Sequence, residues 1–235
     1  MISPRPDLRL DWCSHAAARY AVETWHYSRS MPTPPLVKIG AWEDGRYIGC
    51  VLFSRGASPD LGNPYGLTVT GVCELTRVAL SSHQVPTSRV VAVALRFLRQ
   101  RSPGLRLCVS FADPNQGHHG GIYQAGGWVY TGEVPSTPKY QDAAGRVWHN
   151  RQVAPSGVRR QYNIARRVPR TADCIVLRQL PKHRYLMPLD DAMRAQIAPL
   201  AQPYPKRAKH PSDAPAVQVG EGGAAPTRTL QEATV

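Results

Sequence analysis

The sequence has no apolar run that approaches the length of a membrane span. A transmembrane helix needs about 20 consecutive apolar residues, and no stretch of the 235 residues comes near that length. The first twelve residues, MISPRPDLRLDW, also lack the apolar core of a secretory signal. We therefore expect a soluble, cytoplasmic protein with no membrane partner.

Cysteine pairs are absent as well. The five cysteines occur singly, and none belongs to a CxxC motif. This spacing argues against a disulfide framework and against a cysteine zinc site. Cys50, Cys73 and Cys108 lie within apolar stretches, so we expect them to be small, buried hydrophobic side chains.

Acidic residues are scarce, with 16 Asp and Glu against 29 Lys and Arg, which gives a net charge of +13. The excess is concentrated between residues 151 and 210, where 13 basic residues face 3 acidic ones. So positive a segment favours a polyanionic partner, and nucleic acid is the first candidate. The alternative is a basic surface that serves only solubility.

Apolar spacing and turn signals predict a mixed α/β domain. Ser14 is a capping residue ahead of an Ala-rich helix, and Asp44-Gly45 between two strand-like runs predicts a hairpin. A helix after the hairpin should cross between two parallel central strands. The expected order is helix 14–28, hairpin 36–55, strand 73–81, helix 87–102, strand 105–112, short helix 120–128 and strand 128–134.

The chain changes character after about residue 150. It becomes basic and less periodic, with one strand-like run at 173–180, and from about residue 200 it is rich in Pro, Ala and Gly. Such a composition is typical of disorder. We expect a catalytic domain over 1–150, a basic extension packed on it over 151–195, and a disordered tail over 196–235.

Polar residues gather in one segment, FADPNQGHHGGIYQAGGWVYTG, at 111–132. Asp113 follows an apolar strand, at the end where open α/β sheets place ligands, although a helix cap is an equally good interpretation. Tyr123 falls on the helix that follows, where core packing is the alternative to a functional role. His118 and His119 can bind metal or phosphate, but a Gly-rich loop alone does not fix their geometry.

Three further residues stand out nearer the N-terminus. His26 and Tyr27 end the first helix, where a histidine serves as a base or metal ligand or simply packs. Arg77 lies inside the apolar strand ELTRVAL, so it must be paired or face a cleft. Strand alternation sends Glu74 and Arg77 to opposite faces. The guanidinium therefore suits a carboxylate, phosphate or base edge, with a structural ion pair as the alternative.

The order of elements resembles the GNAT acyltransferase fold, and GGIYQAGGWVYTG is similar to that family's A-x-x-x-Y-x-x-x-G-F-like signature. The resemblance implies a central mixed sheet with flanking helices, with Ser88 and Arg89 at the helix end that binds acyl-CoA pyrophosphate. That position reads VPTSRVVA and lacks the family's glycines. Acyl-CoA binding is therefore not supported.

A closer resemblance is to the Mom family of bacteriophage DNA-modification proteins. It rests on WHYSRSMP, CELTRVAL, the segment 111–132 and PKHRYLMPL. The resemblance implies an enzyme, active in the bacterial host cell, that converts adenine in double-stranded DNA to N6-(methylcarbamoyl)adenine and protects phage DNA from restriction. Carried over residue by residue, it assigns catalytic roles to His26, Tyr27, Arg77, Asp113 and Tyr123.

The same resemblance raises iron as a cofactor, with His26 and Tyr27 near the metal and His118 and Asp113 as competing ligands. Within it, Tyr123 would act as an acid toward a leaving group. Duplex DNA would follow the basic extension, with Tyr162 and Tyr185 stacking on exposed bases. The expected DNA contacts are Arg159, Arg160, Arg166, Arg167, Lys182 and Arg184.

Two other functions stay open. One is an acetyl-CoA-dependent N-acetyltransferase, which calorimetric titration with acetyl-CoA would reveal. The other is a non-catalytic DNA-binding accessory protein, in which the arginines would matter and Asp113 and Tyr123 would not. The group donor, the target sequence and the oligomeric state are not indicated, a homodimer being one alternative.

Overall fold

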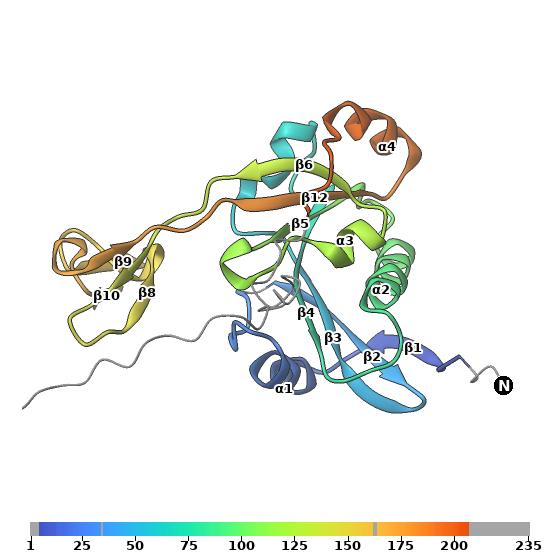
Figure 1. Cartoon of the computed structure of the whole chain (residues 1–235), viewed down its shortest axis with the longest axis horizontal. Helices are drawn as coiled ribbons and strands as arrows, with labels where there is room; N and C mark the ends of the chain where they lie inside the picture. The colour runs from blue at the N-terminus through green and yellow to red at the C-terminus, as the bar shows by residue number, and fades with distance from the viewer. Residues whose placement is uncertain (1–4, 34, 162–163, 207–235) are drawn as a thin grey trace, which may run out of the picture.

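A seven-stranded mixed sheet forms the centre of the computed structural model, which describes residues 5–33, 35–161 and 164–206 (Figure 1). Only one neighbouring pair in it, β4 with β5, is parallel. The predicted α/β class with a mixed sheet is therefore confirmed. In spatial order the strands are β1 (Leu8–Trp12), β2 (Leu36–Glu43), β3 (Arg46–Ser54), β4 (Val72–Leu80), β5 (Leu107–Ala112), β12 (Lys182–Pro188) and β6 (Val129–Val134).

Two helices cover opposite faces of the sheet. Helix α1 (His15–Trp25) begins at Ser14, whose hydroxyl accepts the Ala17 N–H at 3.1 Å, as predicted. Its buried side chains pack on one face together with Cys50. Helix α2 (Thr87–Arg101) packs on the other face. In the described residues no helix has the length and apolar character needed to cross a membrane.

From residue 14 to residue 134 the described chain follows the predicted order of elements, whereas strand β1 was not predicted. The predicted hairpin is β2 and β3, and both residues of its turn, Asp44 and Gly45, have positive φ, of 49° and 79°. This is the backbone of a type I′ turn, which matches the right-handed twist of the strands. The crossover helix is α2, and the short helix is α3 (Gly121–Ala125). The three cysteines expected in the core are buried.

Residues 182–197 differ from the expected basic extension. Strand β12 lies between β5 and β6 and is antiparallel to both, and α4 (Asp191–Ile197) then buries Met193 and Ile197 completely. The segment KHRYLMP begins with three charged or polar residues and continues with apolar ones, so it lacks the strict alternation by which a half-buried strand is recognised. Because of its charged residues, the sequence did not predict this strand, in which Tyr185 is fully buried.

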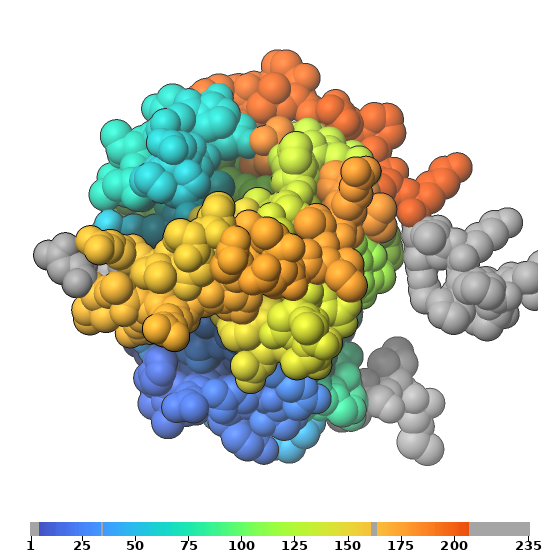
Figure 2. Space-filling view, turned by 90° about the vertical axis from the view of Figure 1, so that its left-hand side faces the viewer, coloured from blue at the N-terminus to red at the C-terminus, as the bar shows by residue number. Residues whose placement is uncertain are grey.

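The chain leaves the sheet after β6 and returns to it at β12, and the described residues between them, 135–161 and 164–181, form a projecting arm. In Figure 1 the arm extends away from the sheet, and in Figure 2 it crosses the face nearest the viewer. Arg151 ties it to the domain by donating to the Ala57 carbonyl at 3.0 Å. Its strands are β7 (Lys139–Gln141), β8 (Val147–His149) and β11 (Ile175–Leu177) in one sheet, and β9 (Val158–Gln161) and β10 (Ile164–Arg167) in another.

The first part of the expected disordered tail packs against the domain. A short 3-10 helix spans Ala198–Leu200, and the Gln202 N–H donates to the Tyr130 carbonyl at 2.9 Å. The Tyr204 hydroxyl donates to the Trp128 carbonyl at 2.7 Å. The first contact forms because β6 is an edge strand with unpaired carbonyls, and Trp128 directly precedes that strand. The remainder of that prediction, 207–235, lies outside the described residues.

Candidate active site

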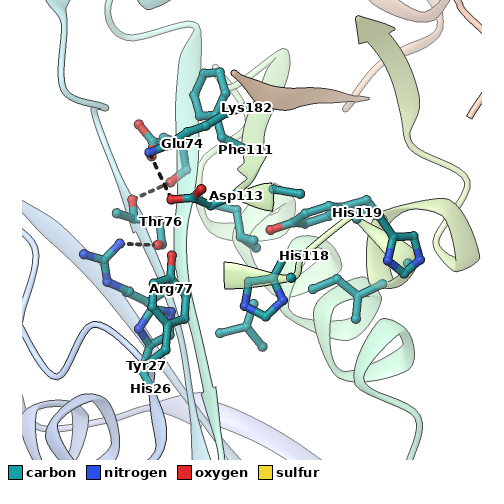
Figure 3. A pocket seen from close by; sticks show the side chains of 18 of the residues that line it. His26, Tyr27, Glu74, Thr76, Arg77, Phe111, Asp113, His118, His119 and Lys182 are labelled. Atoms are coloured by element: carbon teal, nitrogen blue, oxygen red, sulfur yellow. Dashed lines mark hydrogen bonds and ion pairs between the residues drawn. The ribbon is translucent and has the colours of Figure 1, made fainter. Parts of the chain in front are cut away.

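A cavity of about 610 Å³ opens where β4 and β5 separate. The two strands pair only as far as Glu74 and Val109, although both continue further. Their diverging ends, the end of α1, the loop after β5 and helix α3 line the cavity (Figure 3). All five predicted catalytic residues line it, namely His26, Tyr27, Arg77, Asp113 and Tyr123. Residues up to 97 positions apart in the sequence are therefore brought to one place.

A β-bulge in β4 also turns Glu74 into this cavity. Two consecutive residues of β3 pair with Leu75 and Arg77, so Thr76 is an extra residue in the strand. The bulge resets the alternation of side chains. Leu75 is buried in the core, while Glu74 and Arg77 both line the cavity. The expectation that these two residues face opposite sides of the sheet is therefore wrong, and the sequence carried no signal for the bulge.

Glu74 and Arg77 form the charged wall of the cavity. Burial raises the pKa of the Glu74 carboxyl, and the positive charges of Arg77 and Lys182 act against that rise. Arg77 donates from Nη1 to the Thr76 carbonyl at 2.8 Å, but its buried Nε has no hydrogen-bond partner within the described residues. A guanidinium with unused donors in a cavity fits a carbonyl, carboxylate or base edge of a substrate.

Asp113 caps a short helix, which was one of the two interpretations of the sequence, and it also lines the cavity. Its Oδ1 accepts the backbone N–H of Asn115 at 3.0 Å and the Asn115 amide at 2.7 Å, which caps a short 3-10 helix. Its Oδ2 lies 3.9 Å from Lys182 Nζ, and a dashed line joins the pair in Figure 3. One carboxylate oxygen is therefore structural, and the other faces the cavity beside a positive charge.

His26 is held as a neutral ring. The Ser28 backbone N–H donates to its Nδ1 at 3.1 Å, so the proton of the neutral ring is on Nε2. Burial, followed by the nearby charges of Arg77 and His118, lowers the pKa of His26 to about 4. Tyr27 packs beside it, with 4.2 Å between ring centroids. In this state His26 has a donor at Nε2 and no free acceptor, which does not support a role as base.

The arrangement does not fit an iron ion held by His26 and Tyr27. A ligand nitrogen needs a free lone pair, but Nδ1 of His26 accepts from Ser28 and Nε2 carries the proton. Among the described residues, no three His, Cys, Asp or Glu side chains are grouped so that they could hold a metal. Iron stays a prediction of the family resemblance.

The buried neutral His26 makes stability depend on pH. Because its pKa is about 4 in the folded chain and about 6.5 when unfolded, the stability it contributes is present above pH 6.5 and lost as the pH falls. We expect the wild type to lose about 1–2 kcal/mol between pH 7 and pH 5 relative to His26→Asn, which keeps an acceptor for Ser28. Urea unfolding at both pH values measures this difference. An equal change in unfolding free energy between the two pH values for both proteins would contradict the prediction.

Tyr123 lines the cavity but points its hydroxyl at Ser110, at 2.8 Å. Ser110 also bonds the Leu75 carbonyl at 2.9 Å. Since a carbonyl only accepts, Tyr123 donates to Ser110 whenever the single Ser110 proton goes to Leu75. Burial raises the pKa of the Tyr123 phenol. It is therefore protonated at neutral pH, and in this arrangement its proton is directed at Ser110. Ser110, inside a buried strand, gave no functional signal in the sequence.

Tyr185 holds the Gly-rich loop in place through contacts with His119 and Gly120. The Tyr185 hydroxyl donates to the His119 carbonyl at 2.6 Å, and Gly120, with φ of 90°, lies so close that a Cβ there would overlap the Tyr185 ring. Tyr185 is fully buried, so the prediction that it stacks on DNA bases is wrong. Its predicted companion, Tyr162, lies outside the described residues.

The other predicted contacts lie in three places. Ser88 and Arg89, at the start of α2, are not among the residues that line the cavity. Lys182 lines the cavity, and Arg184 donates to Thr131 Oγ1 on β6 at 2.8 Å. The remaining four arginines stand exposed on β9 and β10 of the arm.

Comparison with known proteins places these residues in a family context. A sequence model of the Mom protein family matches residues 7–206. Methylcarbamoylase Mom of Escherichia phage Mu is 25% identical over 207 residues, which cover 85% of this chain and 84% of that protein. FeeM, an N-acyl amino acid synthase from uncultured soil microbes, matches 83% of this chain and 96% of its own at 11% identity, with a TM-score of 0.45. YncA of Salmonella typhimurium, solved with acetyl-CoA, matches 78% and 95% at 13% identity, also with a TM-score of 0.45.

Proposed function

Because the chain belongs to the Mom protein family, we propose that it is an enzyme that modifies adenine in double-stranded DNA by transferring a methylcarbamoyl group to N6. The observation that carries the proposal is that all five residues assigned by the family resemblance line one cavity. Its volume of about 610 Å³ lies within the range of roughly 300–1,000 Å³ that is typical of small-molecule sites.

The target base has to leave the helix to enter this cavity. The N6 amine of a paired adenine is engaged in base pairing, and extruding a base costs a few kcal/mol. Contacts between the basic arm and the phosphates offset that cost. Within the cavity, the unused donors of Arg77 are placed to bind the carbonyl oxygen of the donor group, where negative charge develops.

The transfer needs one base and one acid. The N6 lone pair attacks the carbonyl carbon of an activated methylcarbamoyl donor, so that an N–C bond forms and the bond to the leaving group breaks. Asp113 takes the N6 proton on Oδ2, the oxygen that its cap leaves free. Tyr123 lines the cavity, and its hydroxyl turns away from Ser110 to give its proton to the leaving group. His26, with its proton on Nε2, binds the substrate as a hydrogen-bond donor.

Mass spectrometry of nucleosides tests the proposal. DNA is recovered from a bacterial host that expresses the protein, and we expect a deoxyadenosine species heavier by one methylcarbamoyl group. A species heavier by an acetyl group would instead support the N-acetyltransferase alternative. Unaltered deoxyadenosine, with folded and DNA-binding protein present, would overturn the proposal in favour of an accessory protein.

The role of Tyr123 is tested by a matched pair of substitutions. Tyr123→Phe and Ser110→Ala both break the 2.8 Å hydrogen bond between the two hydroxyls, at a cost of about 1 kcal/mol of stability each. Only the first removes the proposed acid. We expect Tyr123→Phe to slow modification by about 10²-fold or more and Ser110→Ala to stay within a few-fold of the wild type. An equal loss of modification rate in the two variants would show that Tyr123 has a packing role only.

A further inference from the structure

The end of the arm is a two-stranded ribbon with unusual exposure and charge. This basic ribbon consists of β9 and β10, residues 158–161 and 164–167, with the sequences VRRQ and IARR. Neither strand contains an acidic residue, and all side chains of 158–160 and 164–167 are exposed. Its four arginines take part in no ion pair within the described chain, and they are Arg159, Arg160, Arg166 and Arg167.

The pairing register places two arginines on each face of the ribbon. Arg159 is directly opposite Arg166, so their side chains share one face. Arg160 and Arg167 follow in their strands and therefore point to the other face. Like charges directly opposite each other destabilise a strand pair, and an isolated two-stranded ribbon is marginal in water. An anionic partner on both faces would neutralise the repulsion between the arginines and would stabilise the isolated ribbon.

The dimensions of the basic ribbon select one of the two DNA grooves. At about 3.3 Å per residue, four residues span about 13 Å, or roughly four base pairs. The major groove is about 12 Å wide and admits a two-stranded ribbon, whereas the minor groove is about 6 Å wide. Both walls of a groove carry phosphates, so a ribbon inside it presents arginine on both faces to negative charge.

The base of the arm is bonded to the catalytic loop. Asn115 donates to Asp113 Oδ1 and also accepts the Leu180 N–H at 3.0 Å. Lys182, which follows the arm, lines the cavity. The arm therefore begins at the rim of the site. The N6 edge of adenine faces the major groove, which is the side from which such an arm would approach.

We propose that the basic ribbon lies in the major groove of duplex DNA and holds the target base over the cavity. This inference rests on the proposed function, in which duplex DNA is the substrate. It adds the groove and the element that enters it, so Arg159 and its neighbours do more than attract phosphates from a distance.

Binding to duplexes with one blocked groove tests the proposal. The full chain is titrated with one duplex sequence in three forms, namely plain, with glucosylated 5-hydroxymethylcytosine in the major groove, and with netropsin in the minor groove. We expect glucosylation to weaken binding by about 10-fold or more and netropsin to change it by less than about 2-fold. The opposite pattern, or equal affinity for all three, would overturn the ribbon's placement. Absence of binding to the plain duplex would count against the proposed function itself.

Paired substitutions then identify the element. Arg159→Ala/Arg166→Ala should lose most of the discrimination between plain and glucosylated DNA, and its salt slope should fall by about 2 because two phosphate neutralisations are lost. Arg96→Ala/Arg99→Ala, two exposed arginines on α2, is the matched control and should keep both properties. A control pair that behaved like the ribbon pair would show that net charge alone acts, which would contradict the proposal.

Discussion

Replacing Asp113 with Asn is expected to slow DNA modification by about 10²- to 10⁴-fold, the usual contribution of a general base. The side-chain amide oxygen introduced by Asp113→Asn takes the place of Oδ1 and still accepts both hydrogen bonds from Asn115, so the cap is kept. The atom lost is the Oδ2 that faces Lys182 at 3.9 Å. The modified fraction of deoxyadenosine over time, measured by mass spectrometry, gives the rate.

The same exchange at another helix cap is the control. Asp190 caps α4 by accepting the Met193 N–H at 2.7 Å and lies in an ion pair with Arg106, away from the cavity. Asp190→Asn should cost some stability and leave the modification rate within a few-fold of the wild type. Normal modification by folded Asp113→Asn would rule out the carboxylate as the base.

Replacing Gly120 with Ala is expected to cost about 2–4 kcal/mol of unfolding free energy. The φ of 90° disfavours any residue with a Cβ, by about 1 kcal/mol, and the Cβ overlaps the Tyr185 ring. Overpacking a core of this kind adds about 1–3 kcal/mol. Because Tyr185 also holds the His119 carbonyl, the loop that lines the cavity should move and activity should fall with stability.

Gly127→Ala separates the two causes. Gly127 has a φ of 70°, but a Cβ there would meet nothing within 4 Å. It should therefore cost about 1 kcal/mol, from the backbone alone. Urea denaturation of both variants measures the difference. Equal losses would show that the contact between Gly120 and Tyr185 does not constrain the loop.

The sequence predicted those parts of the fold whose signals are local. Ser14 before an Ala-rich stretch and Asp44-Gly45 between apolar runs each specify a structure within a few residues. Strand β12 was missed because its place between β5 and β6 depends on partners 48 to 81 residues away. Its Lys182, His183 and Arg184 also resemble a surface segment.

The candidate site shows the same division. Asp113 was found because the end of an apolar strand is visible in the sequence. Its cap is present and it lines the cavity, while its catalytic role stays a prediction. The period of an ideal strand placed Glu74 on the face opposite Arg77, and so away from the site. The extra residue at Thr76 breaks that period. Neither a bulge nor the tautomer of His26, set by Ser28, is encoded in a short motif. Such features arise only when the chain has folded.

The connection of the arm to the sheet has an evolutionary consequence. Val134 and Lys182, the residues on either side of the arm, are paired with each other in neighbouring antiparallel strands. Topologically, the whole arm is an enlarged hairpin loop, the kind of site at which insertions are tolerated. A descendant could lengthen, shorten or exchange it without altering the order of strands around the cavity. Choice of DNA target and the chemistry performed on it could thus diversify independently, on one inherited scaffold.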